Sequence, residues 1–115
     1  MKKIVLSIDT SDRTKSVVSI EVKGNVEALA VETPLGSGTA VLSGIESLLA
    51  KNSLKVNDIT GIRVATGPGS YTGLRVGASI ANTLSWILNV PVNDKPIGTF
   101  VTRHYYPPFM IPIDR

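Results

Sequence analysis

The run VATGPGSYTGLRVG, from Val64 to Gly77, constrains the fold of this chain more than any other stretch. A β-prone segment ends at Thr66, a loop rich in glycine and proline follows, and a helical pattern begins almost at once. The backbone amides of such a loop can hold a phosphate at the helix N-terminus. The alternative is a tight strand-to-helix turn that needs unusual backbone angles. The phosphate-loop pattern GxxxxGKS/T is absent and the third glycine of GxGxxG falls one position late, so both alternatives stay open.

The rest of the chain alternates between strand and helix patterns. We predict strands over residues 3–9, 15–22, 25–32, 60–65 and 90–93, and helices over about residues 38–51 and 72–88. Lys23-Gly24-Asn25 suits a hairpin turn, with Gly24 at positive φ. Helical crossovers make the later strands parallel to their neighbours. The expected fold class is therefore α/β, a mixed sheet in the order β-β-β-α-β-α-β with helices packed on it.

Length and composition fit a single domain. With 115 residues the chain can build one full core but not two. We expect a core over about residues 1–94 and a tail over residues 95–115. The apolar run after Lys2 and Lys3 stops at Ser7, which is too short for a signal peptide, and nothing approaches a membrane span. We therefore expect a cytoplasmic protein without a membrane partner.

Few residues are suited to catalysis. The chain has no cysteine, and His104 is its only histidine, so a thiol nucleophile and a histidine-rich metal site are excluded. No Ser/His/Asp set has a recognisable context. The formal net charge is +3, but the basic residues are scattered without a stripe, so charge alone gives direct tRNA binding little support.

A second candidate phosphate site follows the first strand, where a carboxylate and two hydroxyls come in sequence. Asp9 and the hydroxyls after it can hold a metal-bound phosphate. The alternative is an Asx-type turn, in which Asp9 accepts hydrogen bonds from local backbone donors. The candidate phosphate-binding residues are Asp9, Thr10, Ser11, Gly67, Gly69 and Ser70.

Small residues recur every four positions along the second predicted helix. They are Gly73, Gly77, Ala81 and Ser85. Each glycine costs about 1 kcal/mol relative to alanine in a helix, so close approach of another element must offset the loss. Two arrangements are open. Either this line packs on the domain's own sheet or first helix, or Leu84, Ile87 and Leu88 cover the sheet and leave the line free for a partner helix.

Two segments resemble one known family. Ile4 to Ser11 (IVLSIDTS) and Val64 to Gly77 are similar to the bacterial TsaB (YeaZ) family of the ASKHA superfamily, and GPGSYTGLRVG is highly specific. The similarity extends over essentially the whole chain, because IPIDR near its end resembles a strand of that family. It implies an actin-like ATPase or ribonuclease H-like lobe, with residues 1–115 as a single N-terminal lobe that ends where a second lobe begins.

The resemblance also implies a function. It implies a role in making N6-threonylcarbamoyladenosine at position 37 of tRNAs, as a non-catalytic subunit paired with the paralogous transferase TsaD and assisted by the ATPase TsaE. Transfer RNA is then reached through the complex. We expect no tightly bound cofactor, with binding of ATP or ADP and Mg²⁺ only at a shared interface of the complex. TsaD carries metal-binding histidines on the helix after its third strand, and residues 38–51 contain none.

By the same resemblance, the two helices pack against those of the partner as a helical bundle. The implied interface residues are Val41, Leu42, Ile45, Leu49, Gly73, Arg75, Gly77 and Ala81. A lobe without its second half exposes apolar surface, which predicts a homodimer when the chain is alone. The competing hypothesis is a nucleotide-binding or hydrolysing enzyme that uses Asp9 and the glycine loop.

Overall fold

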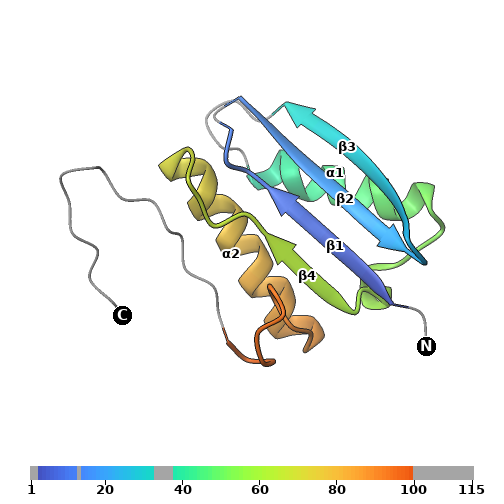
Figure 1. The fold of residues 1–115 in the computed structure, drawn as a ribbon. Helices are drawn as coiled ribbons and strands as arrows, with labels where there is room; N and C mark the ends of the chain where they lie inside the picture. The colour runs from blue at the N-terminus through green and yellow to red at the C-terminus, as the bar shows by residue number, and fades with distance from the viewer. Residues whose placement is uncertain (1–2, 13, 33–37, 100–115) are drawn as a thin grey trace.

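The computed structural model describes residues 3–12, 14–32 and 38–99. Four strands form one mixed sheet in the order β3-β2-β1-β4, and two helices pack on it (Figure 1). The strands are β1 (Ile4–Asp9), β2 (Lys15–Val22), β3 (Asn25–Glu32) and β4 (Gly61–Val64). The helices are α1 (Gly38–Lys51), α2 (Tyr71–Leu88) and a short 3₁₀ helix, η2 (Val56–Asp58). The predicted α/β fold class is confirmed.

The strand pairing follows the predicted pattern. β1 pairs antiparallel with β2, β2 pairs antiparallel with β3, and β1 pairs parallel with β4 after the crossover through α1. The turn between β2 and β3 contains Lys23 at φ 54° and Gly24 at φ 80°. Positive φ at both central residues is the geometry that joins antiparallel strands through two residues. β2 and β3 have the predicted bounds.

The hydrophobic core lies between one face of the sheet and the two helices. Alternate residues of the strands point to this face, and Leu6, Val18 and Ile62 are buried there. The apolar stripe of α1 covers β2 and β3, while α2 covers β4 and β1. No helix among the described residues is long and apolar enough to cross a membrane.

Helix α2 has a defined cap at each end. Ser70 is the N-cap, and its hydroxyl accepts a hydrogen bond of 3.2 Å from the Gly73 N–H. Asn89 ends the helix in the left-handed conformation at φ 58°, and Pro91 follows. The helix begins one residue before the predicted start.

The predicted strand over residues 90–93 is wrong. Val92 makes only an isolated parallel bridge to Ile62. Asn93 and Asp94 have φ values of 53° and 61°, which end the extended backbone. The predicted features of residues 100–115, including His104 and IPIDR, lie outside the described residues.

Candidate functional site

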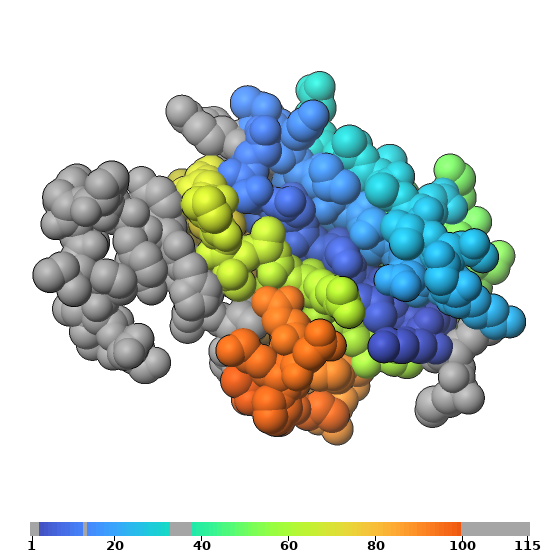
Figure 2. Space-filling model, viewed as in Figure 1, coloured from blue at the N-terminus to red at the C-terminus, as the bar shows by residue number. Residues whose placement is uncertain are grey.

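Two loops meet at the carboxyl ends of β1 and β4. The Ala65 N–H donates to the Ile8 carbonyl over 3.0 Å, and the Ser70 N–H donates to the Ser11 carbonyl over 2.8 Å. Figure 2 shows the yellow atoms of the loop before α2 next to the blue atoms of the segment after β1. The structure therefore brings the two predicted phosphate-binding segments together.

The carboxylate of Asp9 is engaged by its own turn. Its Oδ1 accepts hydrogen bonds from the Ser11 N–H at 3.0 Å and from the Ser11 hydroxyl at 2.6 Å. This is the Asx-type turn that was the alternative to a phosphate role. On the other side of the contact, a Cβ on Gly69 would lie 2.6 Å from the Ser11 Cβ. The glycine of the loop thus permits the close approach of the two segments.

The small-residue line of α2 packs on the chain's own sheet. The Thr10 hydroxyl donates to the Gly73 carbonyl over 2.6 Å, and a Cβ on Gly73 would overlap the Thr10 carbonyl oxygen. A Cβ on Gly77 would overlap the Thr10 hydroxyl oxygen. Ala81 and Ser85 are also buried. Of the two arrangements left open by the sequence, packing within the domain is the one observed.

This packing involves six of the eight residues of the implied interface. Gly73, Gly77 and Ala81 are buried against the sheet of this chain. The three apolar residues Val41, Ile45 and Leu49 of α1 are buried in the same core. The physical reason is that an amphipathic helix turns its apolar stripe to its own sheet first. Of the eight residues, Leu42 and Arg75 are exposed.

A different set of apolar side chains is exposed on the two helices. Trp86 is 74% exposed and Ile87 65%, while Tyr71 and Leu42 are each 45% exposed. We call these four residues the helix apolar surface. The guanidinium of Arg75 lies 5.8 Å from the ring centroid of Tyr71, within the range of a cation–π contact.

Ile87 therefore does not cover the sheet, as the second of the two open arrangements would have required, and the sequence analysis did not single out Trp86. A signal was available in the sequence. Once the small-residue line of α2 faces the sheet, the 3.6-residue period turns Trp86 and Ile87 away from it. Leu84 and Leu88 are partly buried and pack against the core.

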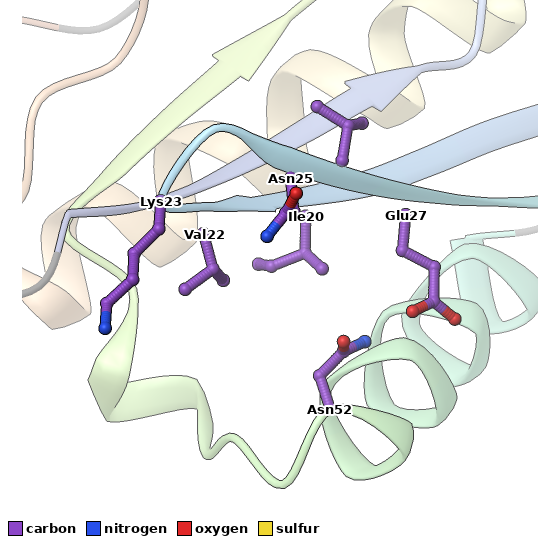
Figure 3. Close-up of a pocket in the computed structure, with 7 residues that line it drawn as sticks. Ile20, Val22, Lys23, Asn25, Glu27 and Asn52 are labelled. Atoms are coloured by element: carbon purple, nitrogen blue, oxygen red, sulfur yellow. The ribbon is translucent and has the colours of Figure 1, made fainter.

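A separate pocket of about 250 Å³ lies between the β2–β3 hairpin and the end of α1 (Figure 3). Ile20 and Val22 form its apolar wall. Glu27 on its rim forms a 2.9 Å ion pair with Lys51, and this hydrogen bond lowers the pKa of the carboxyl group. The Asn52 side-chain amide donates to the Leu48 carbonyl over 2.8 Å. These polar side chains already bond within the chain, so the pocket is a structural feature of the hairpin.

No group of three or more metal-ligating side chains occurs within the described residues. The family model of TsaD, tRNA N6-adenosine threonylcarbamoyltransferase, matches residues 38–94. TsaB of Bacillus subtilis is 32% identical over 89 residues, covering 77% of this chain and 39% of that protein. TsaB of Haemophilus influenzae is 34% identical over 90 residues, covering 76% and 37%.

The chain belongs to the TsaB (YeaZ) family. YeaZ from Pseudomonas aeruginosa, the solved structure of a family member, superposes with a TM-score of 0.73 at 23% identity. That superposition covers 78% of this chain and 42% of the other, and it shows the same fold. The chain spans about two fifths of the length of the TsaB relatives it matches.

Proposed function

We propose that this chain is a non-catalytic scaffold subunit in the synthesis of N6-threonylcarbamoyladenosine at position 37 of tRNAs. In this role it dimerises with a TsaD-like transferase through α1 and α2. The observation that carries the proposal is the helix apolar surface. Exposed tryptophan and tyrosine beside an arginine are the residue types that dominate binding energy at protein interfaces. Membership of the TsaB family supports the choice of partner.

The position of these residues supports a single binding face. Both helices cover the same face of the sheet, so their outer sides point in the same direction. They approach each other near the start of α1, where a Cβ on Gly38 would lie 3.6 Å from Val76. Leu42 lies one turn further along α1, and Trp86 and Ile87 lie in the last turns of α2. A partner helix laid against this side can contact both helices.

The test is binding of the purified chain to the TsaD-like protein of the same organism, measured by calorimetry. We expect Trp86→Ala to weaken binding by about 30-fold or more, the effect of losing about 2 kcal/mol at an interface hot spot. Val56→Ala is the matched control, because Val56 is also an exposed apolar residue but lies in η2. Unchanged affinity of folded Trp86→Ala and Ile87→Ala proteins would refute the proposal.

The proposal extends to the other members of the complex. A TsaE-like ATPase and tRNA join through the assembled complex, and ATP or ADP with Mg²⁺ binds at a shared interface rather than to this chain alone. Membership of the TsaB family supports this extension, and the Asx turn that occupies Asp9 Oδ1 fits a chain that does not hold nucleotide by itself.

A second candidate function is nucleotide binding by the chain itself. The observation that favours it is the meeting of the Asp9–Ser11 and Gly67–Ser70 segments at adjacent strand ends. The test is calorimetry with Mg-ATP, comparing the chain with its Asp9→Asn variant. This variant retains the Oδ1 acceptor for Ser11 but removes the charge. Binding that Asp9→Asn abolishes supports this candidate, whereas binding only in the presence of the partner supports the scaffold proposal.

A further inference from the structure

After α2 the chain closes one edge of the sheet. The Ile62 N–H donates to the Pro91 carbonyl over 3.0 Å, and the Asn93 N–H donates to the Ile62 carbonyl over 2.8 Å. The side chain of Asn93 then bonds both backbone groups of Val64. These bonds hold the segment after α2 against β4, so they fix where the chain goes next relative to the sheet.

The residue that follows lies on the side of the sheet away from the helices. Ile62 is buried on the helix side, and alternation along a strand turns Arg63 to the opposite side. The Asp94 carboxylate lies 3.9 Å from the Arg63 guanidinium. Both residues line a cavity of about 60 Å³ together with Val5, which alternates to the same side of β1. The chain therefore crosses from the helix side to the other side of the sheet between Val92, which is buried, and Asp94.

That other side of the sheet carries small and apolar side chains that no described helix covers. Both helices pack on the opposite side, and Figure 2 shows blue, cyan and green atoms of the strands at the surface. A sheet face that is turned to water is expected to carry polar residues. Here Val26 is 63% exposed and Val17 38%. We call this side the open face, and its members between the charged residues are Ser7, Val17, Ser19, Val26, Ala28 and Ala30.

The sequence beyond Thr99 is rich in large aromatic residues. Both phenylalanines of the chain and two of its three tyrosines fall in residues 100–115, whose sequence is FVTRHYYPPFMIPIDR. The described core between the sheet and the helices contains no phenylalanine or tyrosine. Each such side chain can bury about 150–250 Å². Serine and alanine on the open face leave room above the strands for rings of this size.

We propose that residues 100–115 fold back across the open face and cover it with their aromatic side chains. The described residues end at Thr99, soon after Asp94 has reached that side of the sheet. A segment of this length spans about 50 Å when extended, whereas the outer strands of a four-stranded sheet are roughly 15 Å apart. Because the segment is tethered at the rim of the open face, its effective concentration there exceeds that of a separate protein. The tether is the reason for choosing this segment as the occupant.

This inference goes beyond the proposed function and is compatible with it. The helix apolar surface belongs to α1 and α2, which pack on the other side of the sheet. A segment on the open face therefore leaves that surface free for a TsaD-like partner. The two surfaces can be tested separately in one chain.

The absence of cysteine from the chain permits a direct test. Ser19→Cys places a single thiol on β2, in the middle of the open face between β1 and β3. Its rate of reaction with a small thiol reagent is compared in two whole chains. One has the native segment, and the other carries Tyr105→Ser, Tyr106→Ser and Phe109→Ser. We expect the native segment to slow the reaction by about tenfold or more, because a docked segment must open before the reagent can enter.

A second variant changes the open face and leaves the segment native. Ala30 is exposed on β3, so Ala30→Gln adds a neutral amide without disturbing the core. Docking of the segment would bury that amide without a partner, which is unfavourable. We expect Ala30→Gln to raise the reaction rate of Ser19→Cys in the same direction as the three serine substitutions.

Two controls report on the helix side. Thr83→Cys places a thiol on the exposed side of α2, one turn before Ile87, and should react at the same rate with either segment. Trp86 is the only tryptophan of the chain, so its fluorescence reports on the surroundings of α2. We expect the same emission maximum with either segment.

The outcomes separate the two proposals. Equal reaction rates of Ser19→Cys with the two segments, in proteins with the same circular dichroism spectrum, overturn covering of the open face. Protection of Thr83→Cys by the native segment, or a blue-shifted Trp86 emission, also overturns it, because the segment would then lie on the helices. If the serine substitutions prevent folding, an unchanged rate in Ala30→Gln overturns it. Unchanged partner affinity in Trp86→Ala counts only against the proposed function.

Discussion

The side-chain hydroxyl of Thr10 donates a hydrogen bond of 2.6 Å to the backbone carbonyl of Gly73. This bond joins the turn after β1 to the first turn of α2, and both residues are buried. Because Gly73 has no side chain, the helix backbone rests directly on the backbone of the turn. The contact fixes how α2 leaves the glycine loop, which makes the loop a device for positioning the helix.

The first prediction concerns Gly73. We expect Gly73→Ala to lower the free energy of unfolding by about 3 kcal/mol, because the new Cβ would overlap a backbone oxygen that has no room to move. Gly61→Ala is the control, since a Cβ there meets nothing within 4 Å. Urea denaturation measures both. Equal stability of the two variants would show that α2 can shift away from the turn.

The second prediction isolates the Thr10 hydroxyl. Thr10→Val retains the shape of the side chain but removes the hydrogen bond to Gly73, and we expect a loss of about 1 kcal/mol in unfolding free energy. Thr10→Ser retains the hydroxyl and serves as the matched variant for the bond itself. A Thr10→Val protein as stable as wild type would mean that the bond contributes no net stability.

Much of the fold could be predicted because local patterns and tertiary packing agree. The bounds of β2 and β3 follow from segments rich in β-prone residues, Val and Ile in β2, and from a turn that Gly24 permits. The end of α2 follows from Asn89 and Pro91. The region after Pro91 could not be predicted, because the side chain of Asn93, rather than the backbone of a further strand, bonds the backbone groups of Val64. The β-propensity of Val90 and Val92 predicts a strand, but propensity does not include a hydrogen bond between two segments far apart in the sequence.

The sequence could predict that the two candidate phosphate segments meet, but it could not predict which way the small-residue line of α2 packs. The parallel pairing of β1 and β4 places the segments after them, with Asp9 and Ser70, at the same end of the sheet. The packing direction stayed open because a line of small residues fits either a partner helix or the chain's own backbone. Gly73 and Gly77 pack on the turn at Thr10. Thr10 and Gly73 are 63 positions apart in the sequence. No local pattern encodes that choice.

The third prediction is a pH dependence at the hairpin. The ion pair with Lys51 lowers the pKa of Glu27 from its ordinary value of 4.5. A lowered folded-state pKa gives a stabilisation that is present above the unfolded value and is lost as the pH falls through the folded value. We therefore expect Glu27→Gln to be less stable than wild type at pH 7, with the difference disappearing well below pH 4.5. Urea denaturation at both pH values measures it, and a pH-independent difference would contradict the ion pair as its cause.

The fourth prediction tests the closed edge of the sheet at Asn93. The Val64 N–H donates to Asn93 Oδ1 over 2.9 Å, and Asn93 Nδ2 donates to the Val64 carbonyl over 3.1 Å. Asn93→Gly removes both bonds while tolerating the φ of 53°. We expect a loss of about 2 kcal/mol in unfolding free energy, from two bonds worth about 1 kcal/mol each.

The same variant should also change association, because it exposes the backbone groups of Val64 at an edge that is otherwise satisfied. Sedimentation of Asn93→Gly should show species larger than those of wild type. Asn93→Asp retains an acceptor for the Val64 N–H but places a carboxylate against the Val64 carbonyl. Its stability should therefore recover as the pH falls and the carboxyl group is protonated. An Asn93→Gly protein with wild-type stability and association would show that the backbone from Pro91 to Asn93 closes the edge without the side chain.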